Sequence, residues 1–331
     1  MKESCIFICQ NPQTVLRVYS EEVRNALPAN GPIYTKANIL EKPEAFREVT
    51  CLFSTWGMPS FTEREIEELF PALRAVFYAA GSVQGFAAPF LAKGVKVYSA
   101  WQANAIPVAE FTMAQILLGN KGYFRTAATQ SVGNLSRSAE IAKGYPGNFG
   151  ASVGIIGVGM IGSKVLELLR PFSLHVLAFD AFLSEEEIGA YGAEKVSLPE
   201  LFARCQIVSN HLANNEATRG MIGYDLLARL PSHATFINTG RGAQVREADL
   251  IRLLREREDV TALLDVTDPE PPVAKSPFYE LPNCFLTPHI AGSTGQEVWR
   301  MGEYMQKAYR HWCEGVPSPC EVTAAMLKTM A

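Results

Sequence analysis

The sequence predicts an α/β protein built from two parallel-sheet domains with a cleft between them. Three observations support this prediction: the chain has 331 residues, short apolar runs alternate with helical stretches, and a glycine-rich motif lies in the middle of the chain. A chain of this length typically forms two domains. Strands that alternate with helices are typical of a parallel sheet with crossover helices. Because the motif lies mid-chain, we expect a separate domain to fold ahead of it.

The first domain is expected to comprise residues 1–104 together with 299–331. Short apolar runs in its first part indicate buried strands, and they lie at 4–9, 49–54, 73–78 and 95–98. A helix-favouring stretch at 62–70 separates two of these runs. The stretch 296–311 also has helical character, and we expect this last helix to return to the first domain.

The second domain is expected to comprise residues 105–298. Pro107 fits the first turn of a long helix from Val108 to about Arg125, because proline is tolerated there. The strands that follow are indicated by apolar runs at 153–156, 174–179, 206–209, 234–237, 261–264 and 284–287. Ligands of open parallel sheets bind beyond the carboxyl ends of the strands, so residues that directly follow these runs are the candidates for chemistry.

The first of these strands leads into a glycine-rich turn and a helix. The first glycine permits the tight turn, the second lets a pyrophosphate approach the backbone, and the third lets helix and strand pack closely. The helix N-terminus adds free N–H groups for the phosphates. This pattern predicts a dinucleotide site whose contacts come from Gly157, Gly159, Met160, Ile161 and Gly162. Both parallel-sheet domains are expected to be Rossmann-like or flavodoxin-like.

Asp180 follows the next apolar run, 18 positions after Gly162. A carboxylate at this distance accepts hydrogen bonds from the ribose hydroxyls of the adenosine and repels a 2′-phosphate. No lysine or arginine follows before Lys195. The sequence therefore favours NAD over NADP.

Three polar residues, Arg241, Glu270 and His289, follow later strands of the same sheet. A hydride transferred from a nicotinamide to a ketone builds negative charge on the carbonyl oxygen. Arg241 can polarise that oxygen and hold a neighbouring carboxylate, and His289 can deliver the proton. Glu270 can orient the imidazole and favour its charged form. Taken singly, each also fits a plain surface role: an ion pair, a solvated carboxylate or a turn histidine.

Several longer runs make the chain resemble the NAD-dependent, D-isomer-specific 2-hydroxyacid dehydrogenases: Gly157–Gly162, Asn238–Gly242, Leu264–Pro271, Ser276–Asn283 and Thr287–Gly292. This resemblance implies that Arg241, Glu270 and His289 are the catalytic residues. It also implies that Asp265 reaches the nicotinamide carboxamide. Further cofactor contacts are implied at Leu212, Thr239, Gly240 and Gly292.

The first domain carries the family's glycine turn at Ala79–Gln84. The resemblance implies that the backbone N–H groups of Ser82 and Val83 hold the substrate carboxylate. This chain departs from the usual pattern at 82, 83, 111, 160 and 211–215, and the changes at 82, 83 and 111 leave the identity of the substrate open. Side chains that could shape its pocket, or simply pack in the core, are Ser54, Trp56, Met58, Trp101 and Trp299.

The activity implied is the reversible conversion of a small (R)-2-hydroxy acid to its 2-oxo acid, in a homodimer built on the nucleotide domains. One alternative is a corepressor-like or sensory protein that binds NAD without turnover. A second is formate or phosphite oxidation on the same scaffold, although formate enzymes of this family carry glutamine where this chain has Glu270.

Composition narrows the classes of partner. The net charge of −4 and the pI near 5.8 argue against nucleic acid and against an anionic membrane surface. The longest apolar run near the N-terminus has five residues, which is too short for a signal peptide. Seven scattered cysteines suit reduced thiols and a cytoplasmic location. No spacing of His, Cys and carboxylate residues suggests a metal site.

Overall fold

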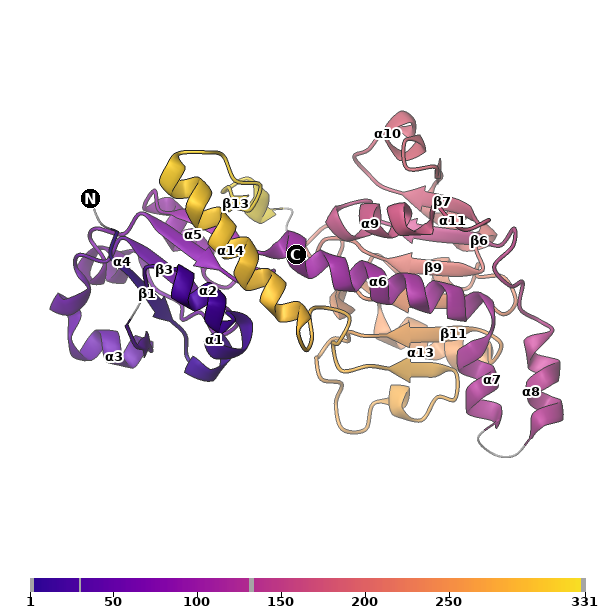
Figure 1. Cartoon of the computed structure of the whole chain (residues 1–331). Helices are drawn as coiled ribbons and strands as arrows, with labels where there is room; N and C mark the ends of the chain where they lie inside the picture. Colours follow the sequence, from indigo (N-terminus) through magenta and orange to yellow (C-terminus); the bar gives the residue numbers. More distant parts are fainter. Residues whose placement is uncertain (1–2, 30, 131–133, 329–331) are drawn as a thin grey trace. The chain divides into compact units, whose positions relative to one another are not determined.

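The computed structural model describes residues 3–29, 31–130 and 134–328. The chain divides into two compact units, Met1–Ala105 with Ser293–Ala331, and Ile106–Gly292. Residues 1–2, 30 and 329–331 of the predicted first domain lie outside the described residues. Each unit contains its own largely parallel sheet, so the predicted α/β architecture with two parallel-sheet domains is confirmed (Figure 1).

The sheet of the first unit has the order β13-β5-β4-β3-β1-β2. All of its pairings are parallel except that between β13 and β5. The four predicted strands are present, and β2 and β13 are additional two-residue strands that are too short to show a periodicity. The strands are β1 Cys5–Ile8, β2 Ile33–Tyr34, β3 Cys51–Ser54, β4 Ala75–Tyr78, β5 Lys96–Ser99 and β13 Glu321–Val322.

The sheet of the second unit has the order β12-β11-β10-β9-β6-β7-β8, and every pairing in it is parallel. The six predicted strands are present, and β8 is an additional short edge strand. The strands are β6 Ser152–Ile156, β7 His175–Phe179, β8 Glu194–Lys195, β9 Ile207–Asn210, β10 Thr235–Asn238, β11 Thr261–Leu264 and β12 Cys284–Leu286.

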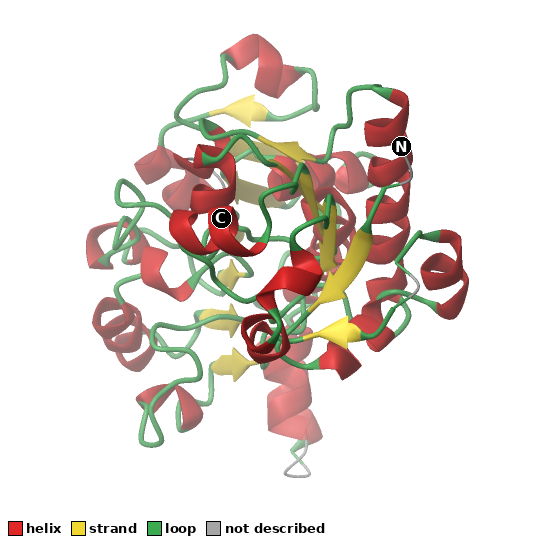
Figure 2. Cartoon of the chain, turned by 90° about the vertical axis from the view of Figure 1, so that its left-hand side faces the viewer, coloured by secondary structure: helices red, strands yellow, loops and turns green. Residues whose placement is uncertain are grey.

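Helices cover both faces of each sheet (Figures 1 and 2). The first unit contains α1 Pro12–Val18, α2 Glu21–Ala26, α3 Lys36–Glu41, α4 Glu63–Leu69, α5 Ala87–Ala92 and α14 Glu297–Glu314. The second contains α7 Tyr123–Gln130, α8 Leu135–Ala142, α9 Met160–Leu169, α10 Glu185–Gly189, α11 Leu198–Arg204, α12 Tyr224–Leu227 and α13 Glu247–Glu256. Short 3₁₀ turns occur at Pro43–Phe46, Gly242–Gln244, Pro277–Tyr279 and Met326–Lys328.

Helix α6, Trp101–Asn120, differs from its prediction at both ends. The expectation that Pro107 opens the helix is wrong, because the helix begins six residues earlier and Pro107 lies inside it. Ala103 and Ala105 are buried, so packing of this turn offsets the N–H that proline lacks. The helix also stops before Arg125, since Gly122 adopts a left-handed φ of 66° and turns the chain into α7.

Neighbouring strand residues are buried on opposite faces of the sheet, so each face is covered by its own layer of helices. In the second unit, Ile155 and Ile237 pack with α6 and α9 on one face, whereas Ile156 and Phe236 pack with α11 and α13 on the other. Side chains of neighbouring strand residues point to opposite faces, so a strand that is buried on both sides is apolar throughout. Among the described residues, no helix is both long enough and apolar enough to cross a membrane.

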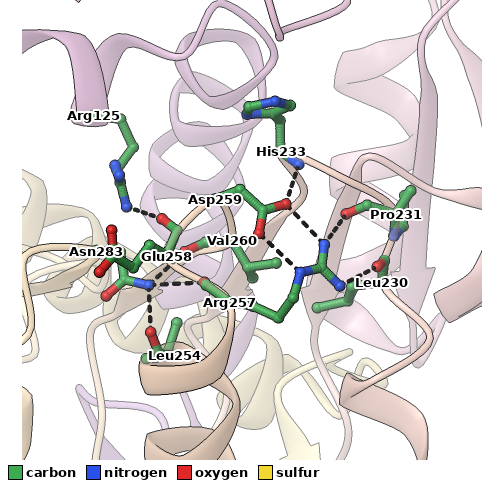
Figure 3. Close-up of polar contacts among 10 residues, drawn as sticks. All are labelled: Arg125, Leu230, Pro231, His233, Leu254, Arg257, Glu258, Asp259, Val260 and Asn283. Carbon is green, nitrogen blue, oxygen red and sulfur yellow. Dashed lines mark hydrogen bonds and ion pairs between the residues drawn. The ribbon is translucent and has the colours of Figure 1, made fainter. Parts of the chain in front are cut away.

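A polar cluster lies at the amino ends of β10, β11 and β12 (Figure 3). Arg257 donates two 2.8 Å hydrogen bonds to Asp259, and also donates to the carbonyls of Leu230 and Pro231. The guanidinium lowers the pKa of Asp259 to about 2. Nearby, the buried amide nitrogen of Asn283 donates to three backbone carbonyls, so the cluster joins the loops at this edge.

Candidate functional site

The glycine-rich turn closes tightly on itself and leaves one side open. Gly157 has a φ of 85°, and a Cβ there would lie 2.8 Å from the carbonyl oxygen of His211. A Cβ on Gly162 would lie 2.0 Å from the carbonyl oxygen of Gly157. A Cβ on Gly159 would meet no atom within 4 Å, so space lies open beside this residue. Helix α9 begins at Met160, as predicted, and its N-terminus faces the turn.

Asp180 connects this turn to the end of β7. Its carboxylate accepts hydrogen bonds from the N–H of Val158 at 2.9 Å, and from the N–H groups of Phe182 and Leu183 at 2.9 and 3.2 Å. Lys195, the first cation after Asp180 in the sequence, donates to the carbonyl of Leu183. The carboxylate is therefore fixed beside the glycine turn, where the sequence placed it.

Buried amide side chains support the loops after β9 and β10. The amide nitrogen of Asn210 donates to Asn238 at 3.0 Å and to Gln244 at 2.6 Å. Gln244 in turn donates to the carbonyl of Leu212 at 2.6 Å and accepts from the N–H of Arg241 at 3.2 Å. All three amide side chains are fully buried. This network fixes the backbone on which the Arg241 side chain is mounted.

Arg241 directly follows that network at the end of β10. Its Nη1 donates to the carbonyl of Gly240 at 2.8 Å. Burial lowers the pKa of the guanidinium, and the negative charge of Glu270 opposes this shift. An arginine remains charged under these conditions, because its ordinary pKa is far above neutrality. Arg241 is therefore a cation held near the carboxylate of Glu270.

Asp265 shapes the loop that carries His289. One carboxylate oxygen accepts from the Thr287 hydroxyl at 2.6 Å and from the N–H of Ile290 at 2.8 Å, and the other accepts from the N–H of Ala291 at 2.9 Å. The N–H of His289 donates to the carbonyl of Asp265 at 3.0 Å. These bonds hold His289 at a left-handed φ of 53°. Asp265 thus has a scaffold role in addition to the cofactor contact that the resemblance implies.

Glu270 and His289 form a direct pair. Oε1 of Glu270 lies 2.5 Å from Nδ1 of His289, and their side chains are 39% and 46% exposed. The contact occupies one ring nitrogen and leaves Nε2 for another partner. Cis peptide bonds precede Pro269 and Pro271 on either side of Glu270. A cavity of about 390 Å³ lies beside the pair, and its wall includes Tyr279 and Leu286.

The remaining predicted cofactor residues lie at the same edge of this sheet. The Leu212 N–H donates to Asn210 at 3.2 Å, and the Gly240 N–H donates to Asn238 at 3.1 Å. The Thr239 hydroxyl lies 3.2 Å from that of Thr112. Ile161 lies in the first turn of α9, and Gly292 ends the segment that follows His289. The structure therefore brings Arg241, Glu270, His289 and the predicted cofactor residues to one edge.

In the first unit, Ser82 and Val83 follow the end of β4. Ser82 is exposed and Val83 is buried. Within the described ranges, no intramolecular acceptor is found for the N–H group of either residue. The side chain of Asn104 lies beside Gly81, the residue before Ser82, and accepts a hydrogen bond from the N–H of Ser293 at 3.0 Å. These two N–H groups have the chemistry expected for carboxylate binding.

The side chains considered for substrate selection fall into two classes. Ser54 and Met58 are buried in the first unit, and the Ser54 hydroxyl donates to the carbonyl of Ile8. Trp101 packs against the same core. In contrast, Trp56 and Trp299 are partly exposed. Packing accounts for the first three side chains and leaves the two exposed tryptophans available for a ligand.

His211 is buried at the end of β9. Its Nε2 lies 2.9 Å from the Ser209 hydroxyl, and burial lowers the pKa of the imidazole to about 3. The ring is therefore neutral near pH 7 and acts as scaffold. Among the described residues, no group of three or more His, Cys, Asp or Glu side chains could hold a metal ion.

Four supporting residues were missed by sequence reasoning: Asn210, Asn238, Gln244 and Glu247. The two asparagines each end a strand run, so the strand-end rule that found Arg241 could have found them. Gln244 and Glu247 act on backbone groups far away in the sequence, at Leu212 and Asp268. The sequence carries no local signal for such contacts.

Known proteins are similar to this chain in sequence and in fold. The family described as D-isomer specific 2-hydroxyacid dehydrogenase, NAD binding domain, matches residues 113–291. The chain is 28% identical over 231 residues to the D-3-phosphoglycerate dehydrogenase of Archaeoglobus fulgidus. That alignment covers 68% of this chain but only 42% of the relative, so this chain corresponds to less than half of the relative's length.

Two solved structures illustrate the similarity of fold. The apo form of Rhodotorula graminis D-mandelate dehydrogenase superposes with a TM-score of 0.79 at 19% identity, covering 97% of this chain and 98% of that one. An acyclic imino acid reductase, solved with NADPH and D-Arg, has a TM-score of 0.73 at 19% identity and covers 96% and 99%. At these identities the two proteins share the fold with this chain.

Proposed function

Because this chain belongs to the D-isomer specific 2-hydroxyacid dehydrogenase family, we propose that it uses NAD to interconvert a small (R)-2-hydroxy acid and its 2-oxo acid. The observation that carries the proposal is the 2.5 Å contact between Glu270 and His289, at the sheet edge that also holds Arg241 and the glycine turn. An imidazole, a carboxylate and a guanidinium at this edge are the groups that carbonyl reduction needs.

The residues at the glycine turn fit a dinucleotide. The open space beside Gly159 admits a pyrophosphate, which the N-terminus of α9 would bind through its N–H groups. Asp180 would accept the ribose hydroxyls and disfavour a 2′-phosphate. The chemistry that a bound nicotinamide would supply is the gain or loss of a hydride at the substrate carbon. These features support NAD as the preferred cofactor.

Arg241 and His289 act on the substrate oxygen in this proposal. During reduction, Arg241 stabilises the negative charge that develops on the carbonyl oxygen. His289, charged and held by Glu270 through Nδ1, donates its Nε2 proton to that oxygen and becomes neutral. In the oxidative direction, neutral His289 accepts the hydroxyl proton. Glu270 keeps the ring orientation fixed in both directions.

We further propose that Ser82 and Val83 bind the substrate carboxylate through their backbone N–H groups. The absence of intramolecular acceptors for these groups within the described ranges supports this role. A backbone contact does not depend on side-chain identity, so the unusual residues at 82 and 83 are compatible with it.

We also propose that the protein forms a homodimer through its second unit. Helices α7 and α8 of that unit expose the apolar side chains of Tyr123 and Leu135, at 52% and 66%. Burial of these side chains against a second copy would stabilise the dimer. Sedimentation of the wild type and of a Leu135→Glu variant tests this, and equal monomeric mass for both would contradict it.

The activity is tested by NADH consumption against a panel of glyoxylate, pyruvate, hydroxypyruvate, phenylpyruvate and branched 2-oxo acids. We expect turnover of at least one of them, with formate and phosphite inactive in the reverse direction. No turnover of any 2-oxo acid would contradict the proposal, and NAD binding without turnover would favour a sensory role. Parallel assays of the wild type and of Asp180→Ala with NADH and with NADPH test the cofactor preference. The ratio of kcat/KM for NADH to that for NADPH should fall about tenfold in the variant.

A further inference from the structure

Two of the contacts that hold the Glu270 loop come from Gly242 and Glu247, which lie outside the catalytic groups. A Cβ at position 242 would lie 2.0 Å from the carbonyl carbon of Thr267 and 2.5 Å from the nitrogen of Asp268. The backbone of Gly242, next to Arg241, therefore packs directly against the Thr267–Asp268 peptide. The loops of Arg241 and Glu270 share this point of contact.

The same peptide is bound from another side by Glu247. Its Oε1 accepts the N–H of Asp268 at 2.8 Å, two residues before Glu270 in the sequence. Glu247 is the first residue of α13 and is partly buried, so its position is fixed by the helix. An acceptor mounted on a helix holds a loop more firmly than one mounted on another loop.

The hydrogen bond from Asp268 needs an acceptor oxygen on residue 247 and does not need a negative charge there. Burial raises the pKa of its carboxyl, the N–H of Asp268 opposes this shift, and the charge of Asp268 adds to it. The negative charge of Glu247 contributes to the raised pKa of the Cys284 thiol. Nη1 of Arg219 lies 3.6 Å from Oδ2 of Asp268. A carbonyl oxygen accepts the Asp268 N–H whether the group is a carboxylate, a neutral acid or an amide.

We propose that Glu247 is a positioning residue for the Glu270–His289 pair. By holding the Asp268 N–H, it fixes the Glu270 loop against the turn of Arg241, and so sets how closely Glu270 approaches His289. The kinetic part of this inference rests on the proposed function, but the geometric part concerns the pair alone. Without the acceptor, the loop loses its hydrogen bond to α13 and the 2.5 Å contact loosens.

The test compares Glu247→Ala and Glu247→Leu, which remove the acceptor, with Glu247→Gln, which keeps one. Asp249→Ala is the matched control, because Asp249 lies in the same first turn of α13 and accepts the backbone N–H of Tyr224 at 3.0 Å, away from the Glu270 loop. Two quantities are measured: kcat and KM for an active 2-oxo acid, and the pH at which the His289 imidazole titrates in NMR spectra, assigned with His289→Asn.

Loss of the acceptor should lower kcat about tenfold, leave the KM for NADH within about twofold, and move the His289 titration to lower pH. Glu247→Gln should restore both readouts, and Asp249→Ala should change neither. Glu247→Leu keeps side-chain volume, so it carries the test if Glu247→Ala does not fold. Wild-type titration in both acceptor-free variants, or an equal change in Asp249→Ala, would overturn the inference. A wild type without turnover would refute the proposed function, and the NMR result would still decide the role of Glu247.

Discussion

The two edges of the second sheet contain the same kinds of side chain and use them differently. At the amino edge, Arg257 and Asp259 bind each other through two hydrogen bonds, and Arg257 also binds two carbonyls (Figure 3). At the carboxyl edge, Glu270 contacts Nδ1 of His289, and both side chains are partly exposed. Saturated polar groups stabilise a fold, whereas a held group with a free donor can act on a ligand.

Two histidines with left-handed backbone provide the sharpest test of this contrast. His289 at the carboxyl edge has a φ of 53°, and His233 at the amino edge has a φ of 60°. Asparagine tolerates this conformation, so one substitution suits both sites. His289→Asn should lower turnover about 10³-fold with a stability change under about 1 kcal/mol, and His233→Asn should leave turnover unchanged. NADH oxidation and thermal unfolding measure both, and equal turnover in the two variants would break the comparison.

The reverse experiment targets the amino edge. Arg257→Ala removes two hydrogen bonds to Asp259 and those to the carbonyls of Leu230 and Pro231, so we expect a loss of about 3 kcal/mol in the free energy of unfolding. Turnover of the folded enzyme should stay within about twofold. Arg241→Lys is the matched variant, since it should lose turnover and keep stability. Urea unfolding measures stability, and kcat/KM measures catalysis. A larger loss of kcat/KM in Arg257→Ala than in Arg241→Lys would contradict the proposed difference between the two edges.

The residues of the carboxyl edge could be predicted from sequence because each of them follows a recognisable strand run in the chain. Arg241, Glu270 and His289 each follow an apolar strand run, and parallel strands bring their carboxyl ends to one edge. The glycine spacing likewise specified Gly157 as a turn and Gly162 as a close contact, and both are found. A rule of this kind needs only the order of residues along the chain.

The parts that were missed depend on contacts between distant segments. Pro107 was expected to open a helix, but the burial of Ala103 and Ala105 extends that helix backwards. Glu247 binds Asp268, which lies 21 residues further along the chain. Nothing in the sequence around Glu247 indicates Asp268 as its partner, because the packing of α13 against the sheet brings the two residues together.

His211 adds a test of stability at the carboxyl edge. Its folded pKa of about 3 is below the ordinary histidine pKa of about 6.5, so the unfolded chain takes up a proton first as the pH falls. This contribution to stability is complete above about pH 6.5 and is lost progressively toward pH 3. At pH 5, about 2 kcal/mol of it has been lost. His211→Gln should remove that part of the pH dependence. The control is His175→Gln, because His175 is exposed. If the urea midpoint of His211→Gln fell with pH as steeply as that of the wild type, the burial argument would be contradicted.

The smallest expected effect concerns Glu270 itself. In reduction His289 must be charged, and the Glu270 carboxylate stabilises that charged ring across 2.5 Å. Glu270→Gln keeps a hydrogen-bond acceptor but removes the charge, so the rate of reduction should begin to fall at a lower pH than in the wild type, with a loss of about tenfold near neutrality. Asp259→Asn removes a carboxylate from the opposite edge and should lower stability without moving this profile. An unchanged profile for Glu270→Gln would mean that the pair orients the imidazole without favouring its charged form, and the two edges would then differ in accessibility alone.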